Sequence, residues 1–176
     1  MRPGPGANGL RRKVAHQGQP GVDWPGMDVF AFLKANPLLR GFTDDGIKII
    51  QAVAAPRQLE AGMPIFVERM LGESLFLLAI GEVTLHVTRG GFEREVGTLY
   101  APDSFGELSL LHPCPRRVTA KTRSPSLLFE IARRDFVRLQ QQRPQACLKL
   151  VVNVTETFAQ RGVAAGPLLE RLVELV

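Results

Sequence analysis

The chain has 176 residues, of which 45% are hydrophobic, so it is long enough for one domain with an appendage and can bury a real core. Its net charge of +5 is concentrated in the first 27 residues, which hold four basic residues and one acidic residue and leave only +2 for the remaining 149. The folded part is therefore nearly neutral, and its charge does not indicate a broad surface for nucleic acid.

The same composition excludes several classes of protein. No apolar run approaches the roughly 20 residues that a membrane span needs, and the first 27 residues lack the apolar region of a secretory signal. The two cysteines, Cys114 and Cys147, are too few for a disulfide framework or a four-cysteine metal site. We therefore predict a cytoplasmic protein with reduced thiols and no membrane span.

Residues 1–27 are expected to form a flexible basic leader, because their Gly-Pro and Pro-Gly pairs cannot bury surface. A contact with nucleic acid or an acidic surface and a purely solvated tail are both compatible with this leader. Met27 also reads as an alternative start of the chain, which would leave out the residues before it. The composition changes at Asp28, where we place the start of the main domain, residues 28–143.

Two short helices are predicted at the start of this domain. Asp28 is a good N-cap for a helix over residues 29–35, which must end before Pro37. Thr43 is the expected N-cap of a second helix, residues 44–53, because two aspartates follow it in the first turn, where the helix dipole favours acids.

Short strands separated by turn signals follow, which is typical of an all-β barrel or sandwich. The predicted strands are residues 56–60, 65–68, 74–80, 83–88 and 92–100. In the fourth strand apolar and polar residues alternate, which indicates one face in contact with solvent. The third strand is apolar from Leu75 to Ile80 and should be central.

The stretch around which the chain is organised, residues 104–122, reads as a glycine turn, one helical turn, a loop with two arginines and a strand. Gly106 lets the backbone bend sharply and lie close to a ligand, and the first N–H groups of the helical turn favour an anion. Strand parity, extended backwards from Val118, places Arg116 on the inward face. Because an unpaired guanidinium in an interior is costly, we expect an anion beside it.

Two simpler interpretations of this stretch remain open. Ser104 and Glu107 have the spacing of a capping box, in which Ser104 caps the helical turn and the Glu107 side chain reaches back to the backbone N–H of Ser104. Such a box implies no ligand. Alternatively, Arg116 pairs with Glu107 in the empty protein, which still leaves a site that an anion could enter.

After Ile131 the hydrophobic period changes from two to about 3.6, which predicts helices for the rest of the chain. One is expected over residues 133–142 and a longer one over 145–161, followed by a break at 162–166 and a last helix from Pro167. Residues 144–176 thus form a predicted segment of C-terminal helices. The long helix carries an apolar stripe made by Leu148, Val151, Val152, Thr155 and Phe158. Together with the apolar face of the last helix, this stripe provides more apolar surface than is needed to cover the strands.

The glycine turn and its loop resemble the phosphate-binding cassette of the cyclic nucleotide-binding domain, the β-roll module of catabolite-activator-type regulators and protein kinase A regulatory subunits. The family pattern is Phe-Gly-Glu-Leu-Ala-Leu, a short loop and Pro-Arg-x-x-Thr. This chain has Phe105-Gly106-Glu107-Leu108-Ser109-Leu110, a short loop, Arg116 and Thr119, and the match continues into residues 128–131. It departs from the family at residues 101–103, which are Ala-Pro-Asp where members usually carry Gly.

This resemblance implies an α+β, mainly β fold, a double-stranded β-helix or β-roll of the jelly-roll type with flanking N-terminal and C-terminal helices. It also implies that Glu107 bonds the ribose 2′-hydroxyl and Arg116 holds the cyclic phosphate. The full set of expected ligand-binding residues is Phe105, Gly106, Glu107, Leu108, Ser109, Arg116, Arg117 and Thr119. Members that prefer guanine often have Thr or Ser at the place of Arg117, so cyclic AMP is the expected ligand, with cyclic GMP and cyclic di-GMP as alternatives.

By the same resemblance the protein is expected to be a regulatory sensor that passes ligand binding through its C-terminal helices to an effector protein. The long helix would pair with its twin in a homodimer, with a monomer as the alternative. The chain ends at Val176 without room for a helix-turn-helix reader, so direct sequence-specific DNA binding is not expected. A ligand-free β-roll scaffold that acts by protein–protein assembly is the second hypothesis.

Enzyme activity has little support in the sequence. The three histidines, His16, His86 and His112, form no metal-ligand pair such as His-x-His, and no nucleophile has a base at a recognisable spacing. We therefore predict a non-enzymatic protein with no cofactor and no metal.

Overall fold

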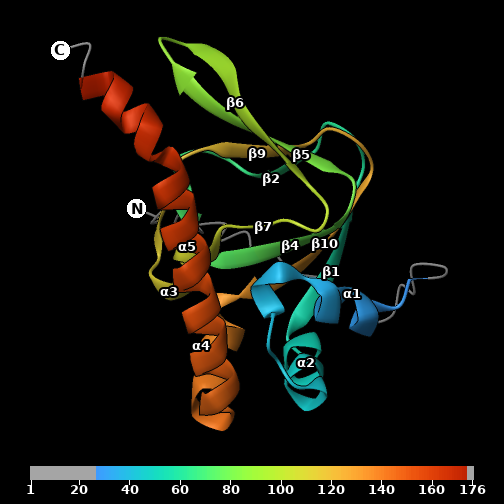
Figure 1. The fold of residues 1–176 in the computed structure, drawn as a ribbon. Helices are drawn as coiled ribbons and strands as arrows, with labels where there is room; N and C mark the ends of the chain where they lie inside the picture. Colours follow the sequence, from blue (N-terminus) through green and yellow to red (C-terminus); the bar gives the residue numbers. More distant parts are fainter. Residues whose placement is uncertain (1–26, 174–176) are drawn as a thin grey trace, which may run out of the picture.

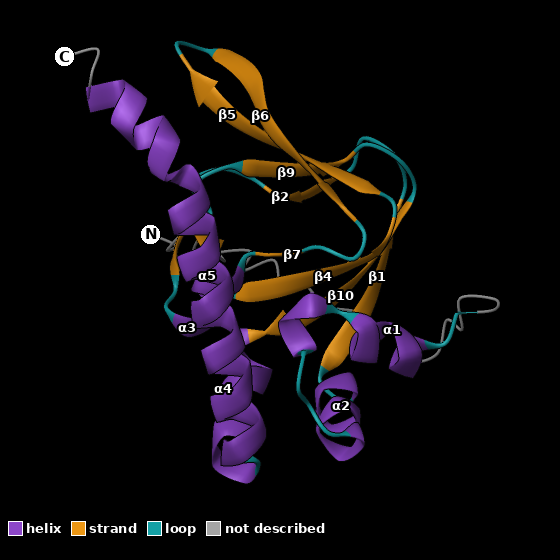
Figure 2. Cartoon of the chain, in the orientation of Figure 1, coloured by secondary structure: helices purple, strands orange, loops and turns teal. Residues whose placement is uncertain are grey.

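The computed structural model describes the backbone of residues 27–173 and the side chains of residues 27–163. The predicted leader, apart from Met27, and the last three residues lie outside this range. The described chain is a mixed α+β fold that is mainly antiparallel β, with helices at both ends, as predicted (Figures 1 and 2). None of the described helices is both long and apolar enough to cross a membrane.

The N-terminal helices form where their caps predict them. Helix α1 (Val29–Ala35) begins after Asp28, whose carboxylate accepts a hydrogen bond from the N–H of Ala31 at 3.0 Å. A 3-10 turn, η1 (Pro37–Leu39), follows, and α2 (Asp44–Gln51) begins after Thr43, whose hydroxyl accepts from the N–H of Gly46 at 3.2 Å. Both caps satisfy N–H groups that lack a partner within the helix.

The strands form two four-stranded antiparallel sheets and one two-stranded ladder. One sheet has the order β1-β10-β4-β7, the other has the order β2-β9-β5-β6, and β3 pairs with β8. Their bounds are β1 (Ala54–Leu59), β2 (Pro64–Phe66), β3 (Leu71–Gly72), β4 (Ser74–Ile80), β5 (Glu82–Arg89), β6 (Phe92–Tyr100), β7 (Ser104–Phe105), β8 (Cys114–Pro115), β9 (Thr119–Thr122) and β10 (Ser126–Ala132). The apolar strand β4 lies between two neighbours, which confirms its predicted central position.

Two hydrophobic cores hold these layers together. The larger core lies between the first sheet and the helices and includes Leu33, Ile47, Leu77, Ile131 and Leu150. The smaller core lies between the two sheets and includes Phe76, Leu78, Val83, Phe105 and Ala120. Because Phe105 belongs to this second core, the cassette is anchored directly in the interior of the roll.

The C-terminal part consists of α4 (Arg133–Gln142) and α5 (Pro144–Val173), which are joined at Arg143. The predicted break at residues 162–166 is wrong, because α5 runs through it and through Pro167 as one helix (Figure 1). Inside a helix, glycine lowers stability by about 1 kcal/mol and proline by about 3 kcal/mol relative to alanine. Neither makes the helical backbone impossible, because proline chiefly removes one hydrogen bond and crowds the carbonyl in the preceding turn.

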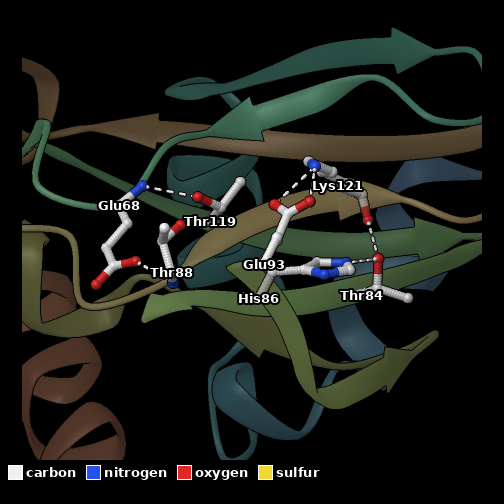
Figure 3. A network of polar contacts seen from close by, with 7 residues as sticks. All are labelled: Glu68, Thr84, His86, Thr88, Glu93, Thr119 and Lys121. Carbon is white, nitrogen blue, oxygen red and sulfur yellow. Dashed lines mark hydrogen bonds and ion pairs between the residues drawn. The ribbon is translucent and has the colours of Figure 1, made fainter. Parts of the chain in front are cut away.

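A network of polar contacts ties the second sheet together (Figure 3). The N–H of Thr88 donates to Glu68 at 2.8 Å, the N–H of Glu68 donates to the Thr119 hydroxyl at 3.0 Å, and Lys121 donates to both oxygens of Glu93 at 2.7 Å. The hydrogen bond from the Thr88 N–H, and after it the one from Arg89, lowers the pKa of Glu68 below its ordinary value of 4.5. The hydrogen bond from Lys121 likewise lowers the pKa of Glu93.

We expect this network to make stability fall in acid. A carboxyl whose folded-state pKa is lowered stabilises the fold above its unfolded pKa, and this contribution is lost as the pH falls through the folded pKa. The urea concentration at the midpoint of unfolding should therefore decrease as the pH is lowered from about 5 to about 3. Glu68→Gln should make this decrease less steep. Glu60→Gln, outside the network, is the control, and equal slopes in both variants would contradict the expectation.

Candidate ligand-binding site

Arg116 lies inside the roll, as strand parity predicts, with 7% of its surface exposed. Its Nη2 donates to the backbone oxygen of Ser74 at 2.8 Å, and its Cζ lies 4.1 Å from the centroid of the Phe66 ring. Its Nε is buried without a hydrogen-bond partner, and no described carboxylate lies within ion-pair distance of its guanidinium. Burial lowers the pKa of Arg116, but guanidinium stays protonated in proteins, so the interior holds a charge that has no direct ion-pair partner among the described residues.

The position of Arg116 comes from the short β3–β8 ladder. The N–H of Arg116 donates to Met70 O at 2.8 Å and the N–H of Arg69 donates to Arg116 O at 2.8 Å, which fixes the backbone on both sides. A Cβ on Gly72, in β3, would lie 2.5 Å from Nε of Arg116. A Cβ on Gly106, which has φ +80°, would lie 2.6 Å from Nη1. The two glycines therefore make the space that the guanidinium occupies.

Helix α3 (Glu107–Leu111) begins at this glycine turn. Gly106 is its N-cap in the left-handed conformation, and none of the described side chains caps the helix. The capping box with Ser104 is therefore wrong, since Ser104 lies in β7 and Gly106 takes the cap position. Leu108 is exposed, whereas the Ser109 side chain is buried, with its hydroxyl 3.8 Å from Sγ of Cys114.

Glu107 is paired with Arg161 of α5, and not with Arg116 as the second simple interpretation supposed. Nη1 of Arg161 donates to Oε1 of Glu107 at 2.6 Å, and Nη2 donates to the backbone oxygen of Ser104 at 2.8 Å. Glu107 is 7% exposed, so its charge lies at the edge of the interior. Sequence reasoning missed Arg161, because the partners are 54 residues apart and no local spacing connects them.

Seven of the eight predicted site residues line one cavity of about 210 Å³. Its walls are Phe66, Leu85, Phe105, Gly106, Glu107, Leu108, Ser109, Pro115, Arg116, Arg117, Val118 and Arg161. Arg117 is an exposed residue of this wall. Thr119 is the exception, because it lies outside the wall and its buried hydroxyl accepts from the N–H of Glu68 (Figure 3). A larger hollow of about 600 Å³, between α2 and the start of α5, contains none of the predicted residues.

A second arginine, Arg133 at the start of α4, holds the other end of α3. Its Nη1 donates to the backbone oxygens of Leu110 and Leu111, both at 2.7 Å. These carbonyls belong to the last turn of α3 and lack helical partners. The cassette helix is therefore attached at its first turn to α5 and at its last turn to α4.

The cavity is built from one buried cation, one carboxylate and a glycine turn, and this combination fits a small anion that also carries hydroxyl groups. The family model of the cyclic nucleotide-binding domain matches residues 56–143, which is half of the chain. The chain belongs to the cyclic nucleotide-binding domain family. The expected β-roll is thus confirmed, and the family is one of regulatory ligand-binding domains.

Two proteins and one solved structure are similar to this chain. The chain is 32% identical over 113 residues to the cyclic AMP receptor protein of Thermus thermophilus, and the match covers 64% of the chain and 52% of that protein. It is 30% identical over 134 residues to glutaminase 1 of Bradyrhizobium diazoefficiens, covering 76% of the chain but 21% of the enzyme. The crystal structure of the Thermus thermophilus catabolite activator protein superimposes with a TM-score of 0.69 at 30% identity, covering 78% of the chain and 63% of that structure.

The chain thus spans about half the length of the Thermus relative and a fifth of the glutaminase. Within the described residues, no three His, Cys, Asp or Glu side chains are placed to hold a metal ion together.

Proposed function

We propose that this domain is a non-enzymatic sensor that binds a cyclic nucleotide, cyclic AMP in the first place, and passes the binding event to a partner protein. The observation that carries the proposal is Arg116, a buried cation that faces a cavity and whose Nε has no hydrogen-bond partner within the described part of the chain. A cyclic phosphate would supply the missing negative charge and the missing acceptor in one group. The name of the Thermus relative, a cyclic AMP receptor, supports the choice of nucleotide.

In this proposal each wall of the cavity has its own task. The phosphate lies against Arg116 and the N–H groups next to Gly106, and the ribose hydroxyl donates to Glu107. The apolar side chains of Leu85 and Val118 offer a surface for the base. Family members that prefer guanine often have Thr or Ser at the position of Arg117, which is an exposed residue of the wall. The arginine at this position therefore favours adenine.

Isothermal titration calorimetry with cyclic AMP, cyclic GMP and cyclic di-GMP tests the proposal. We expect binding heat with cyclic AMP and weaker binding with the other two. Absence of heat with all three would instead support the scaffold, in which the roll positions its helices for assembly and the Arg161 pair with Glu107 is a permanent structural contact.

The output is proposed to pass through α3 into the C-terminal helices. Arg133 and Arg161 connect the two ends of α3 to α4 and α5, so a ligand that moves α3 must change contacts of both helices. Such coupling requires that the ligand bind one arrangement of the helices more tightly than the other. The partner is proposed to contact α5 in the cytoplasm, where the two cysteines, both free in the structure, stay reduced.

We also propose that the exposed face of α5 pairs with a second copy of the chain. Cys147, Leu150 and Val154 pack against the larger core, whereas Leu148, Val152 and Phe158 of the predicted stripe are exposed, Leu148 at 66%. An apolar stripe that stays exposed along a long helix is typical of an interface.

Val152→Glu should therefore convert a dimer to a monomer, because it places a charge in the middle of this stripe. Light scattering coupled to gel filtration gives the mass directly. Glu156→Gln on the same helix is the control and should leave the mass unchanged. A wild-type chain that runs as a monomer at all concentrations would contradict the pairing.

A further inference from the structure

Arg161 holds the carboxylate that the proposed function assigns to the ligand. We propose that Arg161 is an internal competitor, so that ligand binding at Glu107 and docking of residues 158–163 of α5 oppose each other. This inference rests on the proposed function and adds a regulatory contact to it. Its evidence is the geometry of Arg161, which bonds Glu107 on one side and Ser104 O on the other.

Arg161 is also the wall between two hollows. It lines the cassette cavity of about 210 Å³ together with Glu107, and it lines a neighbouring hollow of about 320 Å³ together with Ser104. Glu107 is almost fully buried, so a ligand can reach it only through the cavity that Arg161 closes on one side. When the guanidinium leaves, the two hollows join and the carboxylate faces the enlarged space.

Among the described side chains of α5, those of residues 158–163 depend on this contact for their attachment to the domain. The first half of the helix is held by buried side chains, the last of them Val154, and by Asn153, whose amide donates to Leu38 O and Arg40 O. Every described residue from Phe158 to Val163 is exposed. Among the described side chains beyond Thr157, the hydrogen bonds to the rest of the domain are those of Arg161.

The two events are therefore in competition for one charge. Nη1 of Arg161 donates to Oε1 of Glu107, and both side chains line the same cavity, so a ribose that reaches Glu107 must share the carboxylate with the guanidinium and take up space beside it. The segment 158–163 undocks, starting next to Gly162, where helix propensity is low. By thermodynamic reciprocity, anything that pulls this segment away must raise the affinity for the ligand by the same factor.

Calorimetric titration with cyclic AMP tests the competition. Arg161→Ala should bind roughly tenfold more tightly than the wild type, within the usual range of such couplings, and Arg161→Lys should fall between them. Arg138→Ala, which removes one charge from an exposed pair on α4, is the matched control and should bind as the wild type does. Unchanged or weaker binding in Arg161→Ala would overturn the proposal, and weaker binding would make Arg161 a ligand contact instead.

Hydrogen exchange reads the docking of α5 without depending on affinity. In the ligand-free protein, Arg161→Ala and Glu107→Gln should each speed exchange of residues 158–163, and the double variant should not exceed either one. Saturating cyclic AMP should produce the same change in the wild type. Unchanged exchange in Arg161→Ala would overturn the docking role. Absence of heat in every variant would reject the proposed function, and the competition with it, whereas heat with unaltered affinity rejects the competition alone.

Discussion

Replacing Arg116 with alanine should abolish cyclic AMP binding while leaving the fold almost unchanged in stability. Hydrogen bonds to a charged group contribute about 1.5–3 kcal/mol each, so loss of two bonds to a phosphate predicts an affinity at least about 100-fold lower. In the unliganded protein the substitution removes one hydrogen bond to Ser74 O and the contact with the Phe66 ring, but it also removes a buried charge that no described carboxylate pairs directly. These effects oppose each other, so the free energy of unfolding should change by no more than about 1 kcal/mol, roughly 3 °C in Tm.

Two further variants make this result specific. Arg116→Lys keeps the charge but loses the planar fork, and it should retain weak binding. Arg123→Ala removes an exposed arginine at the end of β9 that pairs with Glu95, and it should bind normally. A thermal-shift series adds an independent readout, because cyclic AMP at 100 times its Kd should stabilise the wild type by about 2.7 kcal/mol and Arg116→Ala not at all. Retained binding in Arg116→Ala would remove the basis of the sensor.

Most of the fold could be predicted because its signals are local. The caps at Asp28 and Thr43, the alternation in β5 and the change of period after Ile131 each depend on neighbouring residues, and each marks an element that the structure contains. The cassette is also a contiguous stretch, so its cavity residues could be named from the chain alone.

The long-range features could not be predicted in this way. The pairs that define the site, Arg161 with Glu107 and Arg133 with the end of α3, join residues far apart in sequence, and each arginine resembles any exposed helix residue until the fold is known. The continuity of α5 through Gly162 is another such case. Local propensity predicted a break, but propensity is a weak preference that the structure overrides.

The inward direction of Arg116 was predicted correctly, but the structure assigns it a different cause. Strand β9 begins only at Thr119, so the alternation of that strand does not reach back to Arg116. The backbone bonds to Met70 and Arg69 next to the β3–β8 ladder orient it instead. Thr119 shows the converse, since it matches the family pattern but bonds the backbone of Glu68 outside the cavity wall.

The Gly106→Ala substitution should damage both stability and binding. At φ +80° an L-residue costs about 1–2 kcal/mol, and the new Cβ would also lie 2.8 Å from the backbone oxygen of Ser74 and 2.6 Å from Nη1 of Arg116. The backbone oxygen cannot move without disturbing β4, which pairs with β7 in front of the cassette. We expect a total destabilisation of about 2–4 kcal/mol, measured by urea unfolding, together with loss of cyclic AMP binding.

Gly62→Ala separates the two causes, because Gly62 has the same φ of +80° but no atom of the described residues lies within 4 Å of its Cβ position. This control should show only the conformational cost of about 1–2 kcal/mol and should keep its affinity. The difference between the variants then measures the close approach of the glycine turn to Arg116 and Ser74. Equal destabilisation in both variants, with binding retained in Gly106→Ala, would contradict this. It would mean that the guanidinium is held in place even when residue 106 carries a Cβ.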